Sequence, residues 1–175
     1  MRTGSECRSP GEAMKAARPG VTQAMLRRAF ARLAFAKPIT YVQPEGNITL
    51  VNLPTYYQVR WPATGYQPGE VATITLLGRT VQIRPQASTY TYDFGDGHHQ
   101  GPTANPGGTY PRGTIRHTYL DHGHADVHVQ AAYTGQYRLP GDTWQDIDLT
   151  VPITGPPVDV QIKQAHAVLL DHSTG

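Results

Sequence analysis

The chain has 175 residues, of which 16% are charged, with 18 Gly, 15 Pro and a single cysteine, Cys7. This composition favours frequent turns over long helices, and one thiol excludes internal disulfides and cysteine-based zinc or redox motifs. Residues 1–37 carry eight Lys or Arg against two Glu, a net charge of +6, whereas the remainder carries seven against eleven acids, a net charge of −4. We therefore expect no nucleic acid to bind the body of the protein.

The N-terminal residues predict an arm followed by a helix. Residues 1–20 lack periodic apolar side chains and contain Gly and Pro near both ends, which predicts a disordered arm. Residues 21–37 predict a short amphipathic helix that Thr22 caps and Pro38 ends. Its apolar positions recur at three- and four-residue steps and its basic positions lie opposite: Val21, Met25, Ala29, Phe30 and Leu33 against Arg27, Arg28 and Arg32.

Three interpretations of this helix compete. It docks its Met25, Phe30 and Leu33 face on the body, which we expect, or it lies as a basic helix at a membrane interface. The third is a twin-arginine signal, suggested by "RRAFAR". That interpretation fails because only "LAFA" separates Arg32 from Lys37, where about 7–15 apolar residues are needed. We expect neither a signal peptide nor a transmembrane segment in this chain.

After Pro38 the hydrophobic pattern has a period of two, with turn residues about every ten positions. Residues 38–65 predict additional strands, 66–153 the main β-sandwich, and 154–175 a C-terminal strand extension and tail. The predicted strands are 48–53, 56–61, 70–77, 80–85, 88–94, 115–119, 125–133, 146–153 and 157–170. Gly78-Arg79 is predicted as a two-residue hairpin turn. No predicted strand leads into a helix, so the expected fold class is all-β, an antiparallel sandwich.

The segment "TYTYDFGDGHHQG" (89–101) places aromatic residues on one face of a strand that ends in a glycine-rich turn. Alternation also puts small aliphatic residues on one face of the strand 125–133. These two faces predict a core: Tyr90, Tyr92 and Phe94 against Ala125, Val127, Val129 and Ala131. Asp96 would repel phosphate and no helix follows, so the turn predicts a sheet corner and not a phosphate-binding loop.

A family resemblance rests on three short motifs: "YDFGDG" (Tyr92, Asp93, Phe94, Gly95, Asp96, Gly97), "HTY" (His117 and Tyr119), and Gly123. In this order they resemble the PKD domain, an immunoglobulin-like sandwich module of cell-surface and secreted proteins, over residues 66–153. The flanking strands resemble, more loosely, those of PKD-containing exported proteins of actinobacteria. Two features depart from the family pattern: Ala125 replaces a usual aromatic, and the 98–115 connection is long.

The glycine turn and the tyrosine after it have expected structural roles. Gly95 and Gly97 permit positive φ, and the carboxylates of Asp93 and Asp96 can accept N–H groups of the turn. Tyr119 is placed to hydrogen-bond backbone across the two sheets, as a tyrosine corner does.

Several histidines suggest a transition-metal site as an alternative function. His122, His124 and His128 lie close in sequence, and His98 and His99 are expected at the same end of the sandwich. The three do not form a good local chelate, because His124 and His128 are about 13 Å apart along a strand. The sequence also lacks the known nucleophile and metalloprotease motifs, so we expect no enzyme and no cofactor.

Residues 134–146 are predicted to form a loop between the last two strands of the sandwich. Tyr137, Arg138 and Trp144 make it a candidate binding surface, unless Trp144 instead folds over the end of the core. With the PKD resemblance, this implies an extracellular or cell-surface module for protein or carbohydrate recognition or spacing. The alternatives are a structural subunit that docks through its basic N-terminal helix, and a His-based metal-binding accessory domain.

Overall fold

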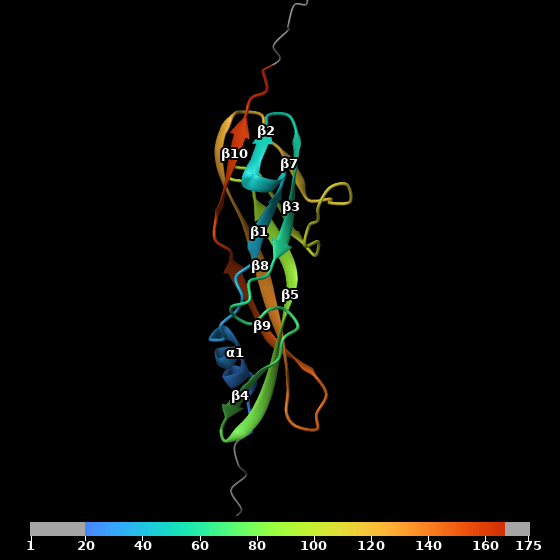
Figure 1. Ribbon diagram of the computed structural model, residues 1–175. Helices are drawn as coiled ribbons and strands as arrows, with labels where there is room; N and C mark the ends of the chain where they lie inside the picture. Colours follow the sequence, from blue (N-terminus) through green and yellow to red (C-terminus); the bar gives the residue numbers. More distant parts are fainter. Residues whose placement is uncertain (1–19, 167–175) are drawn as a thin grey trace, which may run out of the picture.

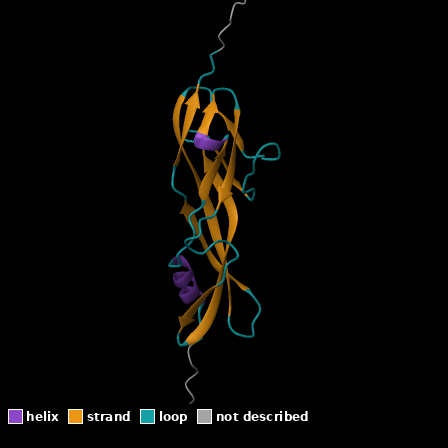
Figure 2. Ribbon diagram, viewed as in Figure 1, coloured by secondary structure: helices purple, strands orange, loops and turns teal. Residues whose placement is uncertain are grey.

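The computed structural model describes residues 20–166, which form a long, narrow molecule whose regular structure is mostly β-strand (Figures 1 and 2). The predicted arm, apart from Gly20, lies outside the described residues, as do Cys7 and the end of the predicted tail. The elements are α1 (Gln23–Ala31), β1 (Ile39–Gln43), η1 (Glu45–Asn47), β2 (Ile48–Leu50), β3 (Pro54–Arg60), β4 (Ala72–Leu76), β5 (Arg79–Asp93), β6 (His99–Thr103), β7 (Arg116–Thr118), β8 (Gly123–Arg138), β9 (Gln145–Thr154) and β10 (Val158–Lys163).

The strands form two sheets. The smaller has the order β1-β3-β7, and the larger follows the path β2-β10-β8-β5-β4, with β6 paired to β5 and β9 paired to β8. The long strands β5 and β8 are antiparallel partners from Gln82↔Arg138 to Asp93↔His128. One pairing departs from the expected antiparallel arrangement, because β2 and β10 run parallel.

Several predicted strand limits are wrong. The predicted strands 80–85 and 88–94 are one strand, β5. A bulge between Ala87 and Thr89 interrupts the alternation of side chains, so the sequence predicts two strands there. The two-residue turn is Leu77-Gly78, one position earlier than predicted, because Leu76 pairs with Arg79. Both turn residues have positive φ, 50° and 71°, as a type I′ hairpin requires.

Both sheets contribute to a single buried core. Tyr90, Tyr92 and Phe94 are buried, and so are the four aliphatic residues predicted to face them, which confirms the predicted core. Tyr57 of β3 meets Phe94 across the sheets with ring centroids 5.0 Å apart. The smaller sheet combines β1 and β3, from the predicted additional strands (38–65), with β7, from the predicted sandwich (66–153). The two predicted regions therefore share one core.

The N-terminal helix docks on the body through Phe30, as predicted, with Leu33 just beyond it partly buried, but it is shorter and its buried face is shifted to include Leu26. Thr22 caps it by accepting a hydrogen bond from the backbone N–H of Met25, and it ends at Ala31 and not at residue 37. Leu26 and Phe30 are fully buried, whereas Met25 is only half-buried. The chain leaves the helix early because the residues that follow bond to another segment: the N–H of Ala36 donates to the Tyr66 carbonyl. Within residues 20–166, no helix is long and apolar enough to cross a membrane.

Candidate functional site

The turn after β5 is held by the bonds that the sequence predicts. Gly95 and Gly97 have φ values of 75° and 90°. Asp93 accepts a hydrogen bond from the Gly95 N–H at 2.9 Å, and Asp96 accepts one from the His98 N–H at 3.1 Å. The backbone of this turn therefore fixes the Asp96 carboxylate at the edge of the molecule, which confirms the predicted corner.

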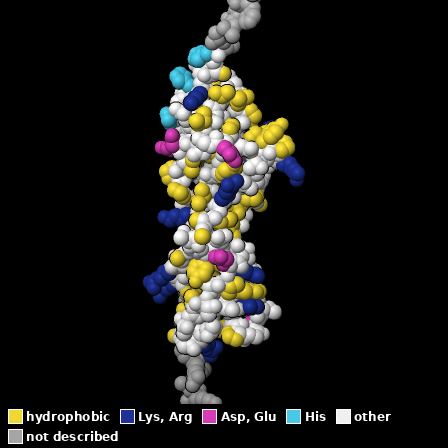
Figure 3. Space-filling model, viewed as in Figure 1, with side chains coloured by type: hydrophobic (Ala, Val, Ile, Leu, Met, Phe, Trp, Pro, Cys, Tyr) yellow, Lys and Arg dark blue, Asp and Glu magenta, His cyan; other side chains and the backbone are white. Residues whose placement is uncertain are grey.

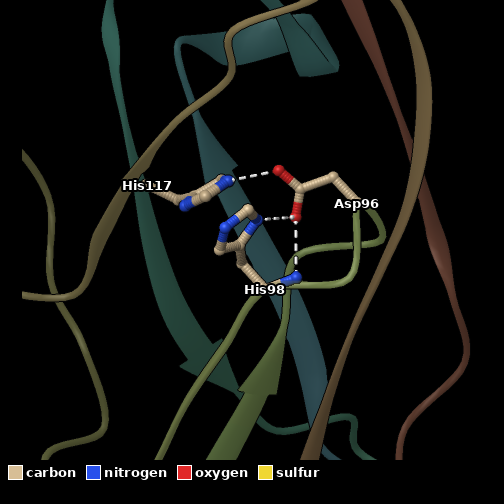
Figure 4. A group of neighbouring side chains, drawn as sticks. All are labelled: Asp96, His98 and His117. Carbon is tan, nitrogen blue, oxygen red and sulfur yellow. Dashed lines mark hydrogen bonds and ion pairs between the residues drawn. The ribbon is translucent and has the colours of Figure 1, made fainter.

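Asp96 faces two imidazole rings that come from different parts of the chain (Figure 4). Its Oδ2 lies 2.6 Å from Nε2 of His117 on β7, and its Oδ1 lies 3.3 Å from Nδ1 of His98. The ligand atoms of all three residues lie within 4.8 Å of one another. This group of three, here called the Asp-His-His cluster, offers one carboxylate and two imidazoles to a single point.

The ring of His117 is more firmly placed than that of His98. It stacks on Phe94 with ring centroids 4.4 Å apart and planes 2° from parallel, and it meets Tyr119 edge to face at 4.8 Å. Its side chain is only 14% exposed, whereas that of His98 is 71% exposed. The ring of His117 is therefore packed into the structure, whereas the ring of His98 lies largely in solvent.

The pKa of the Asp96 carboxyl reflects this environment. Burial alone would raise the pKa, but the hydrogen bonds from His117 and from the His98 backbone outweigh that effect and lower it. The carboxylate is therefore ionised at neutral pH and available as a ligand.

Tyr119 supports the corner from inside the core, as predicted. Its hydroxyl donates to the carbonyl oxygen of Phe94 at 2.9 Å and lies 2.8 Å from the hydroxyl of Tyr57. Burial raises the pKa of Tyr119 to about 12, so this hydroxyl keeps its proton and continues to donate. The hydrogen bond fixes Phe94, on which the ring of His117 rests.

The cluster opens into a hollow lined by four histidines, which we call the histidine hollow: His98, His117, His122 and His124, with Asp96 and Asp121. Figure 3 shows histidine side chains gathered at one end of the molecule, the end at which β10 finishes. His98, His122 and His124 were predicted at one end, and they line the same hollow. Two other histidines do not line it: His99, the first residue of β6, and His128, which lies 4.0 Å from Asp93.

The sequence did not predict His117 as a possible ligand. It was identified only as part of the "HTY" motif. Its spacing from Tyr119 could have predicted its position, because residues two apart on a strand point to the same face. If Tyr119 points toward the Gly95–Gly97 corner, His117 is expected to point there as well.

The second candidate surface, at residues 134–146, is mostly not a loop. Tyr137 and Arg138 belong to β8, and only residues 139–144 connect it to β9, because β8 continues in pairing with β5 as far as Arg138. Trp144 is partly buried, with the guanidinium groups of Arg84 and Arg138 at 4.3 and 4.6 Å from its ring. The Tyr137 hydroxyl bonds to Gln145 at 2.8 Å. These aromatic rings already have partners within the chain. Trp144 packs on two arginines and is not among the side chains packed against the core, so it does not fold over the core as the alternative expected.

A different surface exposes aromatic and aliphatic side chains. Tyr110 is 67% exposed and meets Tyr56 edge to face at 5.8 Å, and Leu53 beside them is 48% exposed. This surface could not be predicted, because Tyr110 lies in the long connection between β6 and β7, which has no periodic pattern.

Comparisons with models of protein families, with curated proteins and with solved structures gave no match. Function is therefore inferred from the side chains and their geometry.

Proposed function

We propose that this chain is a non-enzymatic extracellular or cell-surface module of the PKD type, an immunoglobulin-like sandwich that holds its neighbours apart. The observation that carries this proposal is the position of the two ends. The described chain begins beside α1 at one end of the long molecule and leaves after β10 at the opposite end (Figure 1). Anything joined to the two ends is separated by the whole length of the molecule.

The construction of the body supports a spacer role. The strands β5 and β8 remain paired from Gln82↔Arg138 to Asp93↔His128. In addition, a single buried core includes side chains from both sheets and from α1. A shared core resists bending, because a hinge would have to open packed apolar surface to water. The PKD assignment draws support from the Gly95–Gly97 corner and from the hydrogen bond of Tyr119 to the Phe94 carbonyl.

The spacer role can be tested by measuring the distance between the ends. Spin labels on Gly20→Cys and Gln164→Cys, in a Cys7→Ser background, should give one narrow distance distribution in pulsed electron spin resonance. The matched control is Gly20→Cys with Asp142→Cys, since the 139–144 connection lies at the same end as α1 (Figure 1). A broad distribution for the first pair, beside a narrow short one for the control, would contradict the spacer role.

A recognition role is favoured by one observation, the exposed Tyr110 and Leu53. Exposed aromatic rings can anchor a protein partner or stack on sugar faces. Retention of the protein on purified cell-wall polysaccharide should then fall with Tyr110→Ala and stay unchanged with Tyr137→Ala. If both variants are retained like the parent, this surface does not bind polysaccharide.

Docking of a larger assembly through the basic helix has less support. The apolar residues Leu26 and Phe30 are already buried against the body, and Arg27 forms an ion pair with Asp148. A partner or a membrane would meet only the polar side of α1, where Arg28 and Arg32 are exposed.

A further inference from the structure

We propose that the Asp-His-His cluster binds a divalent transition-metal ion of the zinc type, independently of any spacer role. Its ligands are one carboxylate oxygen of Asp96, Nδ1 of His98 and Nε2 of His117. Imidazole and carboxylate together suit zinc and its neighbours in the first transition series, whereas calcium and magnesium prefer oxygen ligands alone.

One of the two contacts of Asp96 already has the spacing of ligands in a tetrahedral site. With metal–ligand bonds of about 2.0–2.1 Å, two ligands of a tetrahedral zinc ion lie about 3.3 Å apart. Asp96 Oδ1 and His98 Nδ1 are 3.3 Å apart. Asp96 Oδ2 and His117 Nε2, at 2.6 Å, share a hydrogen bond; an ion there would take the place of the hydrogen, with the imidazole proton carried on Nδ1, and the two atoms would move apart. Because the two imidazoles contact different carboxylate oxygens, one of them must shift for all three residues to share an ion, and the exposed His98 has the room to do so.

A purely structural role explains Asp96 and His117 but not His98. The hydrogen bond between Asp96 and His117 would fix β7 to the corner without any ion. It does not explain His98, whose side chain is 71% exposed and yet places Nδ1 toward the same carboxylate. Its ring also lies 5.4 Å from the ring of His117, centroid to centroid. An ion bound by all three residues gives His98 a role.

The surroundings favour a site of three protein ligands with one position left open. Asp96 and His117 are held by the turn and by the stack on Phe94, so two ligands are preorganised. The cluster opens into the histidine hollow, where His122 and His124 also lie. We expect water in the fourth position, because His124 already pairs its Nδ1 with Asp159 at 3.0 Å and His122 is exposed.

Zinc binding should be measured directly on the full chain, without a histidine tag. The Cys7→Ser background removes the only thiol, which could otherwise hold zinc. Titration with zinc chloride should give one ion per chain in calorimetry and raise the melting temperature, and chelator should reverse the shift. In nuclear magnetic resonance spectra, the ring signals of His98 and His117 should shift in proportion to the ion added.

Matched variants separate this site from weak binding by surface histidines. His98→Ala should weaken zinc affinity by at least about tenfold, since it removes a ligand. The control is His99→Ala, the adjacent exposed histidine, which lies outside the hollow and should leave affinity within roughly twofold. Asp96→Asn should also weaken binding, and its circular dichroism should show whether the fold is retained. If Asp96→Asn does not fold, the comparison of His98→Ala with His99→Ala still decides.

Two results would overturn the proposal. In the first, zinc neither binds the parent in stoichiometric amount nor shifts its melting temperature. In the second, His98→Ala and His99→Ala bind zinc as tightly as the parent, while His122→Ala or His124→Ala abolishes binding. That result would place the ion elsewhere in the hollow, away from Asp96.

Discussion

Two glycines of one turn have the same backbone conformation but different surroundings. Gly95 and Gly97 both have positive φ. A Cβ atom on Gly95 would lie 2.7 Å from the backbone N and O of Asp126 on β8, whereas one on Gly97 would meet nothing within 4 Å. Gly97 is therefore needed for conformation alone, and Gly95 is needed in addition for the close approach of the turn to β8.

The two alanine variants should differ for this reason. Gly97→Ala should lower the free energy of unfolding by about 1 kcal/mol, the usual cost of a non-glycine residue at positive φ. Gly95→Ala should lower it by more than about 3 kcal/mol, because strain and backbone contact add. Urea denaturation followed by circular dichroism measures both. Equal losses would show that the turn does not press against β8.

Among the elements, α1 shows how a single glycine makes room for a helix. The ring of Phe30 occupies the space over Gly135 of β8, where a Cβ atom would come within 2.6 Å of it. The same ring meets Phe35 edge to face at 5.0 Å, and Phe35 in turn contacts Tyr133. The helix is thus joined to the body mainly by an aromatic cluster, with the ion pair of Arg27 and Asp148 at its exposed side.

A double-mutant cycle can test this packing. Gly135→Ala should destabilise the protein because the new methyl group overlaps Phe30, by about 1–3 kcal/mol. Phe30→Leu should also destabilise it, but the double variant should lose less than the sum, since the smaller side chain makes room for the methyl group. Thermal and urea unfolding provide the values. Arg28→Ala, on the exposed side of α1, is the control and should change stability by less than about 0.5 kcal/mol. Additive losses would show that Phe30 does not lie over Gly135.

Local patterns predicted some elements well and others poorly. The alternation in β5 and β8 identified Tyr92 and Val129 as core, because both faces of a strand follow from a period of two. The strand β6 could not be predicted, since "HQGPT" contains Gly and Pro and is a strand only through its pairing with β5. At the candidate site the turn bonds were predictable because they are local. The meeting of His117 with Asp96 joins residues 21 positions apart, and only the packing of β7 on β3 produces it.

At the scale of the whole molecule, buried tyrosines make stability depend on alkaline pH. Burial, with a smaller effect of the nearby Tyr90, raises the pKa of Tyr92 and Tyr133 above the ordinary value of 10.0. Each ring must keep its proton in the folded state but can lose it once unfolded. Their contribution is therefore complete below about pH 10 and is lost as the pH rises toward the folded-state pKa values.

We accordingly expect the melting temperature to fall steeply above about pH 10. Tyrosinate absorbance should report exposed tyrosines first and the buried ones only as the protein unfolds. Tyr92→Phe, which cannot ionise, should show a shallower fall over the same pH range than the parent. An identical fall for both proteins would mean that Tyr92 is not shielded from water in the folded state.

The exit of the chain at opposite ends also determines how the protein would respond to tension. A pull on residues 20 and 166 acts along the strands, while the hydrogen bonds of β10 to β8 and to β2 lie across them. Such bonds are loaded together in shear and cannot open one after another. In single-molecule stretching, the protein should therefore yield in one step at high force. A pull across the hairpin of β4 and β5 should separate those two strands at much lower force, because there each bond breaks in turn.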